Sequence, residues 1–422
     1  MSAPPSPAYA RYVLGLLFLV YVVNFVDRQI LSILLDPVKQ DLGVSDTAMG
    51  FLTGFAFATL YTLTGIPVAR LADRGSRRSV IAVGLAVWSA MTAASGLARS
   101  FGWLVLARVG VGIGEAAGTP PAHSLLADYF PPERRARALG FYANGIYVGT
   151  MLAYLAGGWV ATHFDWRTAF FLVGLPGIPL ALLVRASVRE LPRGASEAAG
   201  AEEASAPLGE VLRYLFARRT FVHLLFGGSL LSLSGYGVLV WGPAFLGRVH
   251  ALPRDEIGWR LGILIGTCGS LGAWLGGALA DRLGRRDPSW ILRAPALATL
   301  AALPFAAGFL LLPSANLALA SFAPFYVLAN TYVGPVWASL QGISRLRMRA
   351  TASALHLFIL NLVGLGAGPL VVGGLNDLLA ARFGAEAIRW SLCIVAALAA
   401  TGSLFLLRAS RSLPRDLITR EG

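Results

Sequence analysis

The chain has 422 residues, of which 56% are hydrophobic and only 14% charged, and its mean hydropathy is +0.65. This composition excludes an ordinary soluble globular protein and is typical of a membrane protein. A net charge of +13 would suggest a nucleic-acid partner in a soluble chain, but 34 of the 35 basic residues are arginines, and most lie between apolar stretches. We therefore interpret the arginines as topology signals and expect no nucleic-acid partner.

Apolar stretches of about 20 residues, the length that crosses a bilayer, predict twelve transmembrane helices and an all-α membrane fold. The expected spans are 12–35, 47–69, 79–98, 102–124, 137–161, 167–186, 220–246, 257–280, 291–312, 315–338, 350–374 and 387–408. The first stretch is too long for a signal-peptide core, so we expect it to remain as a span. Arginine clusters follow the second, fourth, eighth and tenth spans, and the positive-inside rule then makes these loops and both termini cytoplasmic. A bacterial inner membrane is the expected location.

One long polar segment divides the predicted spans into two sets of six. It covers residues 187–218 and is rich in Ala, Gly, Ser, Glu and Arg. The expected organisation is an N-terminal six-helix bundle over 1–186, a cytoplasmic linker over 187–218, and a C-terminal six-helix bundle over 219–422 with a short cytoplasmic tail. The low hydrophobicity of this segment is what a tether between the two bundles requires, and it indicates no functional site there.

No metal or cofactor site is evident. Both cysteines, Cys268 and Cys393, fall within apolar stretches, so neither a disulfide scaffold nor a cysteine metal site is expected. The five histidines lack metal-binding spacing, and we expect each to be structural or interfacial. They are His123, His163, His223, His250 and His356.

The two halves contain an internal repeat. ARLADRGSRR follows the second span, from Ala69 to Arg78, and GALADRLGRR follows the eighth, from Gly277 to Arg286. The same register places Gly50 on Gly258 and Gly54 on Gly262. Two repeats of six spans in the same orientation are the layout of a rocking transporter whose site lies near the middle of the bilayer.

GALADRLGRR resembles the loop signature of the major facilitator superfamily, and the first copy matches it except that Ala69 and Ser76 replace two glycines. The resemblance covers about residues 10 to 410. It implies that the acidic and basic residues of both copies act as conformational latches between the halves; topology alone would require charge but not this spacing of Gly and Asp. The implied latch residues are Asp73, Arg74, Arg77, Arg78, Asp281, Arg282, Arg285 and Arg286.

Two further stretches resemble the Spinster branch of that superfamily. They are NFVDRQILSILLDPVKQDLGVSDTAMGFLTG, starting at Asn24, and RVGVGIGEAAGTPPAHSLLADYFPPERRARALG, starting at Arg108. The branch is associated with export of sphingolipids or lysophospholipids, and its prokaryotic members with proton coupling. The resemblance therefore implies a proton-coupled transporter of amphiphiles, in contact with membrane lipid and present as a monomer.

Four ionisable residues lie inside the predicted spans, where charge is costly and usually functional. They are Asp27 and Arg28 in the first span and Arg108 and Glu115 in the fourth. At 1.5 Å per residue, Asp27 and Arg108 reach similar depths, and Glu115 lies roughly 10 Å deeper than Arg108 on the same helix face. The spacing favours an Asp27–Arg108 pair and leaves Glu115 near Arg28 or facing the cavity.

We expect Asp27 and Glu115 to respond to protons, because a carboxyl group that alternates between water and an occluded site changes its protonation state. Arginine keeps its proton, so Arg28 and Arg108 are expected to switch partners or to bind an anionic head group. A static charge network joining the two helices is the alternative.

The second half carries aromatic and neutral polar side chains instead of buried charge, which suits an amphiphile with a polar head and an apolar tail. The predicted cavity residues are Asn24, Tyr236, Trp241, Asn330, Tyr332, Trp337 and Asn361. Ordinary helix packing or an interfacial position is the alternative for each of them.

The function favoured by these patterns is a secondary active transporter that moves a small amphiphilic or lipid-like solute by alternating access. An uncoupled facilitator of another organic solute, a lipid-modifying membrane enzyme and a receptor remain as alternatives. The sequence contains no GxSxG, HExxH or P-loop motif, which disfavours the enzyme. In the fifth span, GTMLAYLAGG resembles an antiporter-associated pattern but has Ala153 and Tyr154 in place of Gly-Pro, so symport, antiport and uniport remain open.

Overall fold

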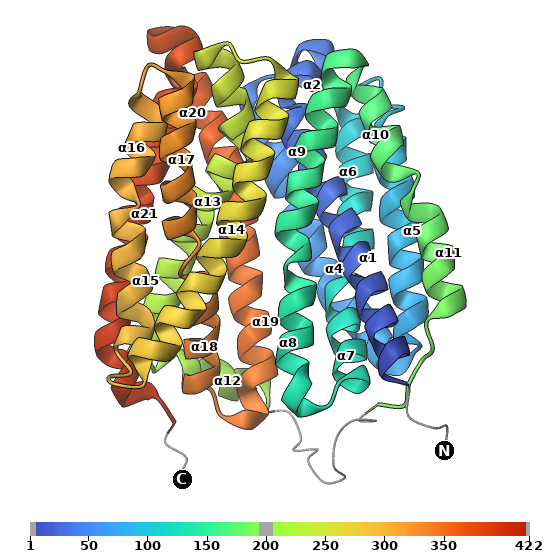
Figure 1. The fold of residues 1–422 in the computed structure, drawn as a ribbon, viewed down its shortest axis with the longest axis vertical. Helices are drawn as coiled ribbons and strands as arrows, with labels where there is room; N and C mark the ends of the chain where they lie inside the picture. Colours follow the sequence, from blue (N-terminus) through green and yellow to red (C-terminus); the bar gives the residue numbers. More distant parts are fainter. Residues whose placement is uncertain (1–5, 194–205, 419–422) are drawn as a thin grey trace. The chain divides into compact units, whose positions relative to one another are not determined.

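The computed structural model describes residues 6–193 and 206–418, and the side chains of Ile66, Ala69, Asp73 and Leu346 lie outside that description. The described residues form helices and connecting loops, without strands (Figure 1). The first half contains α1 (Pro7–Ile33), α2 (Leu35–Leu42), α3 (Asp46–Gly50), the π-helical segment η1 (Phe51–Phe55), α4 (Ala56–Arg74), α5 (Arg77–Ser95), α6 (Phe101–Glu115), α7 (Thr119–Tyr129), α8 (Pro132–Ala143), α9 (Gly145–His163), α10 (Trp166–Gly174) and α11 (Gly177–Ser187).

The second half begins with a short helix that the sequence analysis had placed inside the linker. Its helices are α12 (Leu208–Phe216), α13 (Arg219–His250), α14 (Arg254–Gly284), α15 (Trp290–Ala301), α16 (Leu303–Leu311), α17 (Ala315–Ala329), α18 (Val333–Ile343), the 3-10 turn η2 (Leu346–Met348), α19 (Arg349–Leu360), the π-helical segment η3 (Asn361–Ala367), α20 (Gly368–Phe383), the 3-10 turn η4 (Gly384–Glu386) and α21 (Ala387–Asp416). Helix α12 buries Val211 and Leu215 in the core around α13 and α21, so this part of the predicted linker is a packed element.

Ten stretches of the described chain are long and apolar enough to cross a membrane. They include Pro7–Ile33, Phe101–Tyr129, Arg219–His250 and Arg254–Gly284, and the last is one 68-residue stretch, Arg349–Asp416. At 1.5 Å per residue, 68 residues span about 100 Å, more than one bilayer crossing. The predicted span 137–161 is divided instead between α8 and α9, because the helix is interrupted at Asn144.

The chain forms two compact units. Unit 1 comprises residues 1–44, 56–201 and 253–262, and unit 2 comprises residues 45–55, 202–252 and 263–422. Helix α3 and segment η1 therefore belong to unit 2 although they form the beginning of the second predicted span, 47–69, and the start of α14 belongs to unit 1.

Small residues bring α5 and α6 into close contact in unit 1. A Cβ atom at Gly114 would lie 2.6 Å from the backbone nitrogen of Trp88, and one at Gly84 would lie 2.8 Å from the carbonyl oxygen of Gly114. Glycines at such crossings let helix backbones approach closely within a membrane. The contact fixes the position of α6, which carries Arg108 and Glu115.

Candidate functional site

The buried charges of unit 1 form a compact group on α1 and α6. Arg28 donates to the carboxylate of Glu115 from Nη2 at 2.5 Å and from Nε at 3.0 Å. The side chain of Glu115 is fully buried and that of Arg28 is 9% exposed. Asn24, one helical turn before Arg28, accepts a weaker hydrogen bond at 3.4 Å. The sequence analysis left Glu115 near Arg28 or facing the cavity, and the structure shows these two side chains in a direct ion pair.

Aromatic rings surround the guanidinium group of Arg28. Its central carbon lies 4.7 Å from the ring centre of Phe25, 5.0 Å from that of Phe57 and 5.1 Å from that of Tyr61. A cation near an aromatic face is attracted by the ring quadrupole, more strongly when it is desolvated. Arg28 therefore has aromatic contacts that persist if its carboxylate partner is lost.

Asp27 and Arg108 do not form the predicted side-chain pair. Arg108 donates from Nη1 to the main-chain carbonyl of Asp27 at 3.0 Å and from Nη2 to that of Arg28 at 3.3 Å. This is a correction to the sequence-based geometry, because depth along two helices does not determine whether a long side chain meets a carboxylate or a backbone oxygen. Arg108 is 1% exposed, and its two terminal nitrogens bond to main-chain carbonyls of α1, whereas its Nε has no hydrogen-bond partner among the described residues.

The carboxylate of Asp27 is completely buried. The side chains of Thr92 and Trp88 lie beside it, but neither oxygen makes a hydrogen bond of ordinary geometry. The charges that act on it most strongly are those of Glu115 and Arg108. A buried charge is costly unless it is paired or hydrogen-bonded, and uptake of a proton removes that cost.

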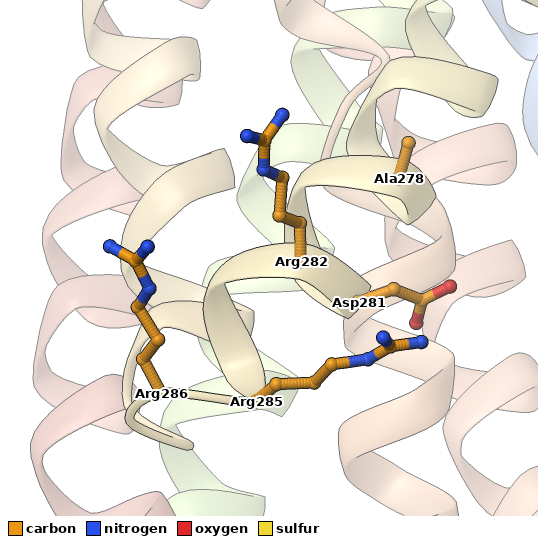
Figure 2. Close-up of a pocket in the computed structure, with 5 residues that line it drawn as sticks. All are labelled: Ala278, Asp281, Arg282, Arg285 and Arg286. Atoms are coloured by element: carbon orange, nitrogen blue, oxygen red, sulfur yellow. The ribbon is translucent and has the colours of Figure 1, made fainter.

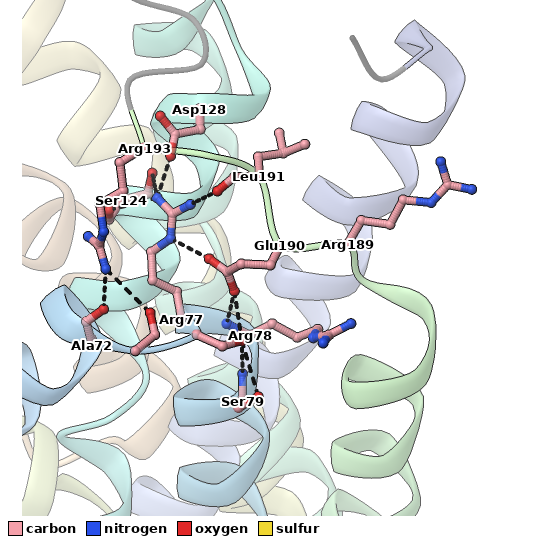
Figure 3. A network of polar contacts seen from close by, with 12 residues as sticks. Ala72, Arg77, Arg78, Ser79, Ser124, Asp128, Arg189, Glu190, Leu191 and Arg193 are labelled. Carbon is pink, nitrogen blue, oxygen red and sulfur yellow. Dashed lines mark hydrogen bonds and ion pairs between the residues drawn. The ribbon is translucent and has the colours of Figure 1, made fainter. Parts of the chain in front are cut away.

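Unit 1 also holds the first copy of the repeated motif in a buried polar network (Figure 3). Arg77 is 1% exposed and forms ion pairs with Asp128 at the end of α7 and with Glu190 after α11, the latter at 2.8 Å. Its guanidinium also donates to the carbonyls of Ser124 and Leu191, at 3.2 and 2.7 Å. The motif thus ties α5, α7 and the segment after α11 together.

Glu190 accepts three hydrogen bonds at this junction. The donors are Nε of Arg77 at 2.8 Å, the backbone N–H of Arg78 at 2.9 Å and the hydroxyl of Ser76 at 2.9 Å. Partial burial opposes ionisation of Glu190, but the bonds from Arg78, Arg77 and Ser76 outweigh it and lower the pKa of this carboxyl.

The segment 188–193 continues along unit 1 through further hydrogen bonds. Arg189 donates its backbone N–H to the hydroxyl of Tyr9 at 2.9 Å, and its carbonyl accepts from the hydroxyl of Tyr129 at 2.7 Å. Arg193 donates to the carbonyls of Ala72 and Gly75, the latter at 3.4 Å. We call residues 188–193 the strap. The sequence analysis had assigned these residues to the tether. The acidic side chain of Glu190 was the signal in the sequence that could have indicated a partner for the arginines of the repeated motif.

The remaining predicted latch residues have different environments. Arg78 donates to the carbonyl of Val188 at 3.0 Å, and Arg74 is exposed. The side chain of Asp73 lies outside the described residues. In unit 2 the four predicted latch residues are all exposed at the end of α14; they are Asp281, Arg282, Arg285 and Arg286. The role of both copies as latches stays a prediction.

The predicted cavity residues of unit 2 do not share one environment. Trp241 is completely buried, and its indole N–H donates to the carbonyl of Pro369 at 2.9 Å, so it packs within the unit. Trp337 is partly buried and meets His356 edge to face, with 5.3 Å between ring centres. The other predicted cavity residues of unit 2 are partly exposed; they are Tyr236, Asn330, Tyr332 and Asn361.

A buried ion pair in unit 2 was missed by the sequence analysis. Asp46, at the start of α3, accepts from both terminal nitrogens of Arg248 at 2.5 and 3.0 Å and from Asn376 at 2.9 Å. Asp377 accepts from the backbone N–H groups of Asp46 and Thr47, at 3.1 and 2.8 Å. Local sequence carried no signal for it, since these residues are about 200 and 330 positions apart.

The family model of the Major Facilitator Superfamily matches residues 17–366, most of the chain. A solved bacterial homolog of the human lysosomal transporter Spinster, in an inward-facing and unoccupied conformation, superposes with a TM-score of 0.89 at 32% identity and covers 99% of this chain and 100% of its own. The chain is a major facilitator superfamily transporter of the Spinster branch. Both expectations from the repeated motif and from the NFVDRQIL stretch are confirmed.

Curated relatives support the same Spinster-branch assignment. An MFS-type efflux pump of Mycolicibacterium smegmatis is 37% identical over 417 residues, covering 98% of this chain and 95% of the relative. Protein spinster homolog 1 of Homo sapiens is 28% identical over 396 residues, covering 88% and 74%. The fold and these relatives are those of transporters, so the alternative of a lipid-modifying enzyme is excluded.

Proposed function

We propose that this Spinster-branch transporter moves a small amphiphilic or lipid-like solute by proton-coupled alternating access. The observation that carries the proposal is the carboxylate of Asp27, which is completely buried, makes no hydrogen bond of ordinary geometry and lies close to the charge of Glu115. Such a carboxylate is ionised at low cost only when water reaches it, which couples its proton to the conformation of the transporter.

The second step involves Glu115. Protonation of its carboxyl group removes the negative charge that pairs with Arg28, while Asn24 and the aromatic rings of Phe25, Phe57 and Tyr61 stay beside the guanidinium group. An anionic head group can replace Glu115 at Arg28, because a guanidinium pairs well with carboxylate or phosphate oxygens. Uptake of a proton and binding of an anionic solute are thereby linked at one arginine.

The proposed solute has an apolar part as well as a polar head. Aromatic rings flank the cation in unit 1, and we propose that Tyr236, Asn330, Tyr332, Trp337 and Asn361 of unit 2 contact the solute. Sites with many aromatic and few charged groups suit amphiphiles. The mycobacterial relative's name, efflux pump, supports export as the direction of transport.

The proposed topology has twelve spans with both termini in the cytoplasm of a bacterial inner membrane, in a monomeric protein. The arginine-rich loops support this orientation. The proposed divisions are the two six-helix bundles, and the proposed latches are the two copies of the repeated motif.

The test is transport of a labelled lysophospholipid or sphingoid phosphate in proteoliposomes, with and without a pH gradient. We expect gradient-dependent transport by the wild type and loss of that dependence in Asp27→Asn and Glu115→Gln. Glu133→Gln removes an exposed acid of α8 and is the charge-matched control. Gradient dependence that survives in both site variants would leave the buried charges as a static network, and absence of any lipid movement would overturn the solute class.

A further inference from the structure

The repeated motif has acidic partners in unit 1 but not in unit 2. Arg77 and Arg285 occupy the same position of the motif. Arg77 is buried between Asp128 and Glu190, whereas Arg285 is exposed and forms no ion pair with any described residue. The second copy therefore presents exposed guanidinium groups that form no ion pair with a described residue.

The sequence explains the missing partner of the second copy. The chain leaves α11 as RASVRELPR, residues 185–193, and the end of α21 repeats this as RASRSLPR, residues 408–415. The second version is one residue shorter and lacks the glutamate. The next acid, Asp416, accepts from the backbone N–H of Thr220 at 3.0 Å and lies 3.8 Å from Arg218, so it serves another junction.

The other acidic partner is also absent from the repeat. Aligning the arginines of the loop after α7 with those after α18 places Arg137 on Arg349 and Asp128 on Leu340. Leu340 is completely buried in the apolar core of unit 2. Both acids that hold Arg77 thus have no acidic counterpart near Arg285.

These guanidinium groups line an open pocket of about 480 Å³ at the end of α14 (Figure 2). Its lining residues are Ala278, Asp281, Arg282, Arg285 and Arg286. In Figure 2, Arg282 and Arg286 extend toward one side of the helix end, and Arg285 and Asp281 toward the other. The lining contains three arginines and one aspartate, so it has an excess of positive charge.

The neighbouring acid, Asp287, is hydrogen-bonded within its own turn and does not line the pocket. Asp287 accepts from the backbone N–H and the hydroxyl of Ser289, at 2.9 and 2.6 Å. Arg293, at the start of α15, lies 5.4 Å from the ring centre of Trp290 and adds a further cation beside this turn.

An exposed apolar stripe leads to the pocket along α14. Leu271, Leu279 and Arg282 are spaced by eight and three residues, which places them on one face of the helix, and Arg286 follows two residues after the helix ends. Leu271 is 47% exposed and Leu279 40% exposed. From Leu271 to Arg282 the helix rises about 16 Å, comparable to an acyl chain lying beneath its head group.

We propose that the pocket formed by Ala278, Asp281, Arg282, Arg285 and Arg286 binds the phosphate head group of an anionic phospholipid of the adjoining leaflet. Arg282 and Arg286 pair with the phosphate oxygens, and the acyl chains lie along Leu271 and Leu279. Arginine suits this role because its planar donors match phosphate geometry, and basic clusters at the cytoplasmic ends of spans attract anionic lipids. The site does not depend on the identity of the transported solute.

The experiment is titration of the purified full-length protein with phosphatidylglycerol or phosphatidylcholine, followed by native mass spectrometry. We expect tighter binding of phosphatidylglycerol, weakened about 30-fold in the double variant Arg282→Gln/Arg286→Gln, in line with the contribution of two arginines near an anionic surface. The matched control is Arg134→Gln/Arg137→Gln, which removes two exposed arginines of α8 and should leave the affinity within about threefold.

A second pair of measurements separates charge from geometry and lipid from free anion. Arg282→Lys/Arg286→Lys keeps the charge but loses the planar donors, and we expect an intermediate affinity. Millimolar inorganic phosphate should not displace the lipid, because it lacks the chains that contact the apolar stripe. Any one of three results would overturn the proposal. They are equal affinity for both lipids, an equal loss of affinity in the Gln double variant and its control, and full displacement of the lipid by inorganic phosphate.

Discussion

Replacing Glu190 with glutamine should release the strap from unit 1. The carboxylate accepts hydrogen bonds from Arg77, Arg78 and Ser76, and its side chain is 28% exposed. A hydrogen bond to a charged group contributes about 1.5–3 kcal/mol, but glutamine keeps one acceptor oxygen, and Arg77 keeps Asp128. We therefore expect opening of the strap to become easier by about 2 kcal/mol, a change of about 30-fold in the opening equilibrium.

Hydrogen–deuterium exchange of a peptide covering residues 188–193 measures this change directly. The backbone N–H of Val188 donates to Val184 and that of Arg189 to Tyr9, so both amides report on the strap. Exchange at these amides should accelerate about 30-fold in Glu190→Gln, while peptides of α13 in unit 2 keep their wild-type rates. Glu133→Gln, at an exposed position, is the control. A change in the strap no larger than that of the control would refute the reasoning.

Three further predictions follow from named contacts. Because the folded-state pKa of Glu190 is lowered, its stabilisation of the strap is fully present above its ordinary pKa of 4.5 and is lost as the pH falls through the lowered value. Protease resistance of the strap should therefore drop in acid, and Glu190→Gln should lack that step. Gly276→Ala in α14 should destabilise unit 2 by about 1–3 kcal/mol, since its Cβ would clash with the carbonyl oxygen of Thr331, whereas Gly277→Ala, with open space, should be neutral or stabilising in thermal unfolding. Trp241→Phe should lose about 1 kcal/mol with the indole hydrogen bond to Pro369, seen as a lower unfolding temperature.

Each of these three predictions has a result that contradicts it. An acid step that persists in Glu190→Gln would assign the pH dependence to another group. Equal unfolding temperatures for Gly276→Ala and Gly277→Ala would mean that the backbone of α14 yields without cost. A Trp241→Phe protein as stable as the wild type would show that the freed carbonyl finds another donor.

Hydropathy, arginine placement and the internal repeat were sufficient to predict a helical transporter of this family, because a bilayer permits few alternatives to apolar helices. The same constraint made Asp27, Arg28, Arg108 and Glu115 conspicuous. Their depth predicted the Arg28–Glu115 proximity, but the Asp27–Arg108 pair was wrong because rotamers decide between a carboxylate and a backbone oxygen.

The strap and the Asp46–Arg248 pair were not predicted, for two different reasons. Glu190 lay in a segment whose low hydrophobicity suggested a tether, and hydropathy does not register the partners of a single charge. Asp46 and Arg248 are 202 residues apart, and local sequence contains no information on which distant helices meet. Both features depend on tertiary packing.

The π-helical segment η3 joins α19 to α20 with wider turns than an α-helix. A π turn accommodates one extra residue, and its return to α geometry shifts the register of the preceding helix by one position, a rotation of about 100°. Asn361 begins this segment, and His356 lies one and a half turns before it. A change from π to α geometry in a few backbone hydrogen bonds of η3 would thus turn a different face of α19 toward its neighbouring helices. The chain would stay helical from α19 to α20.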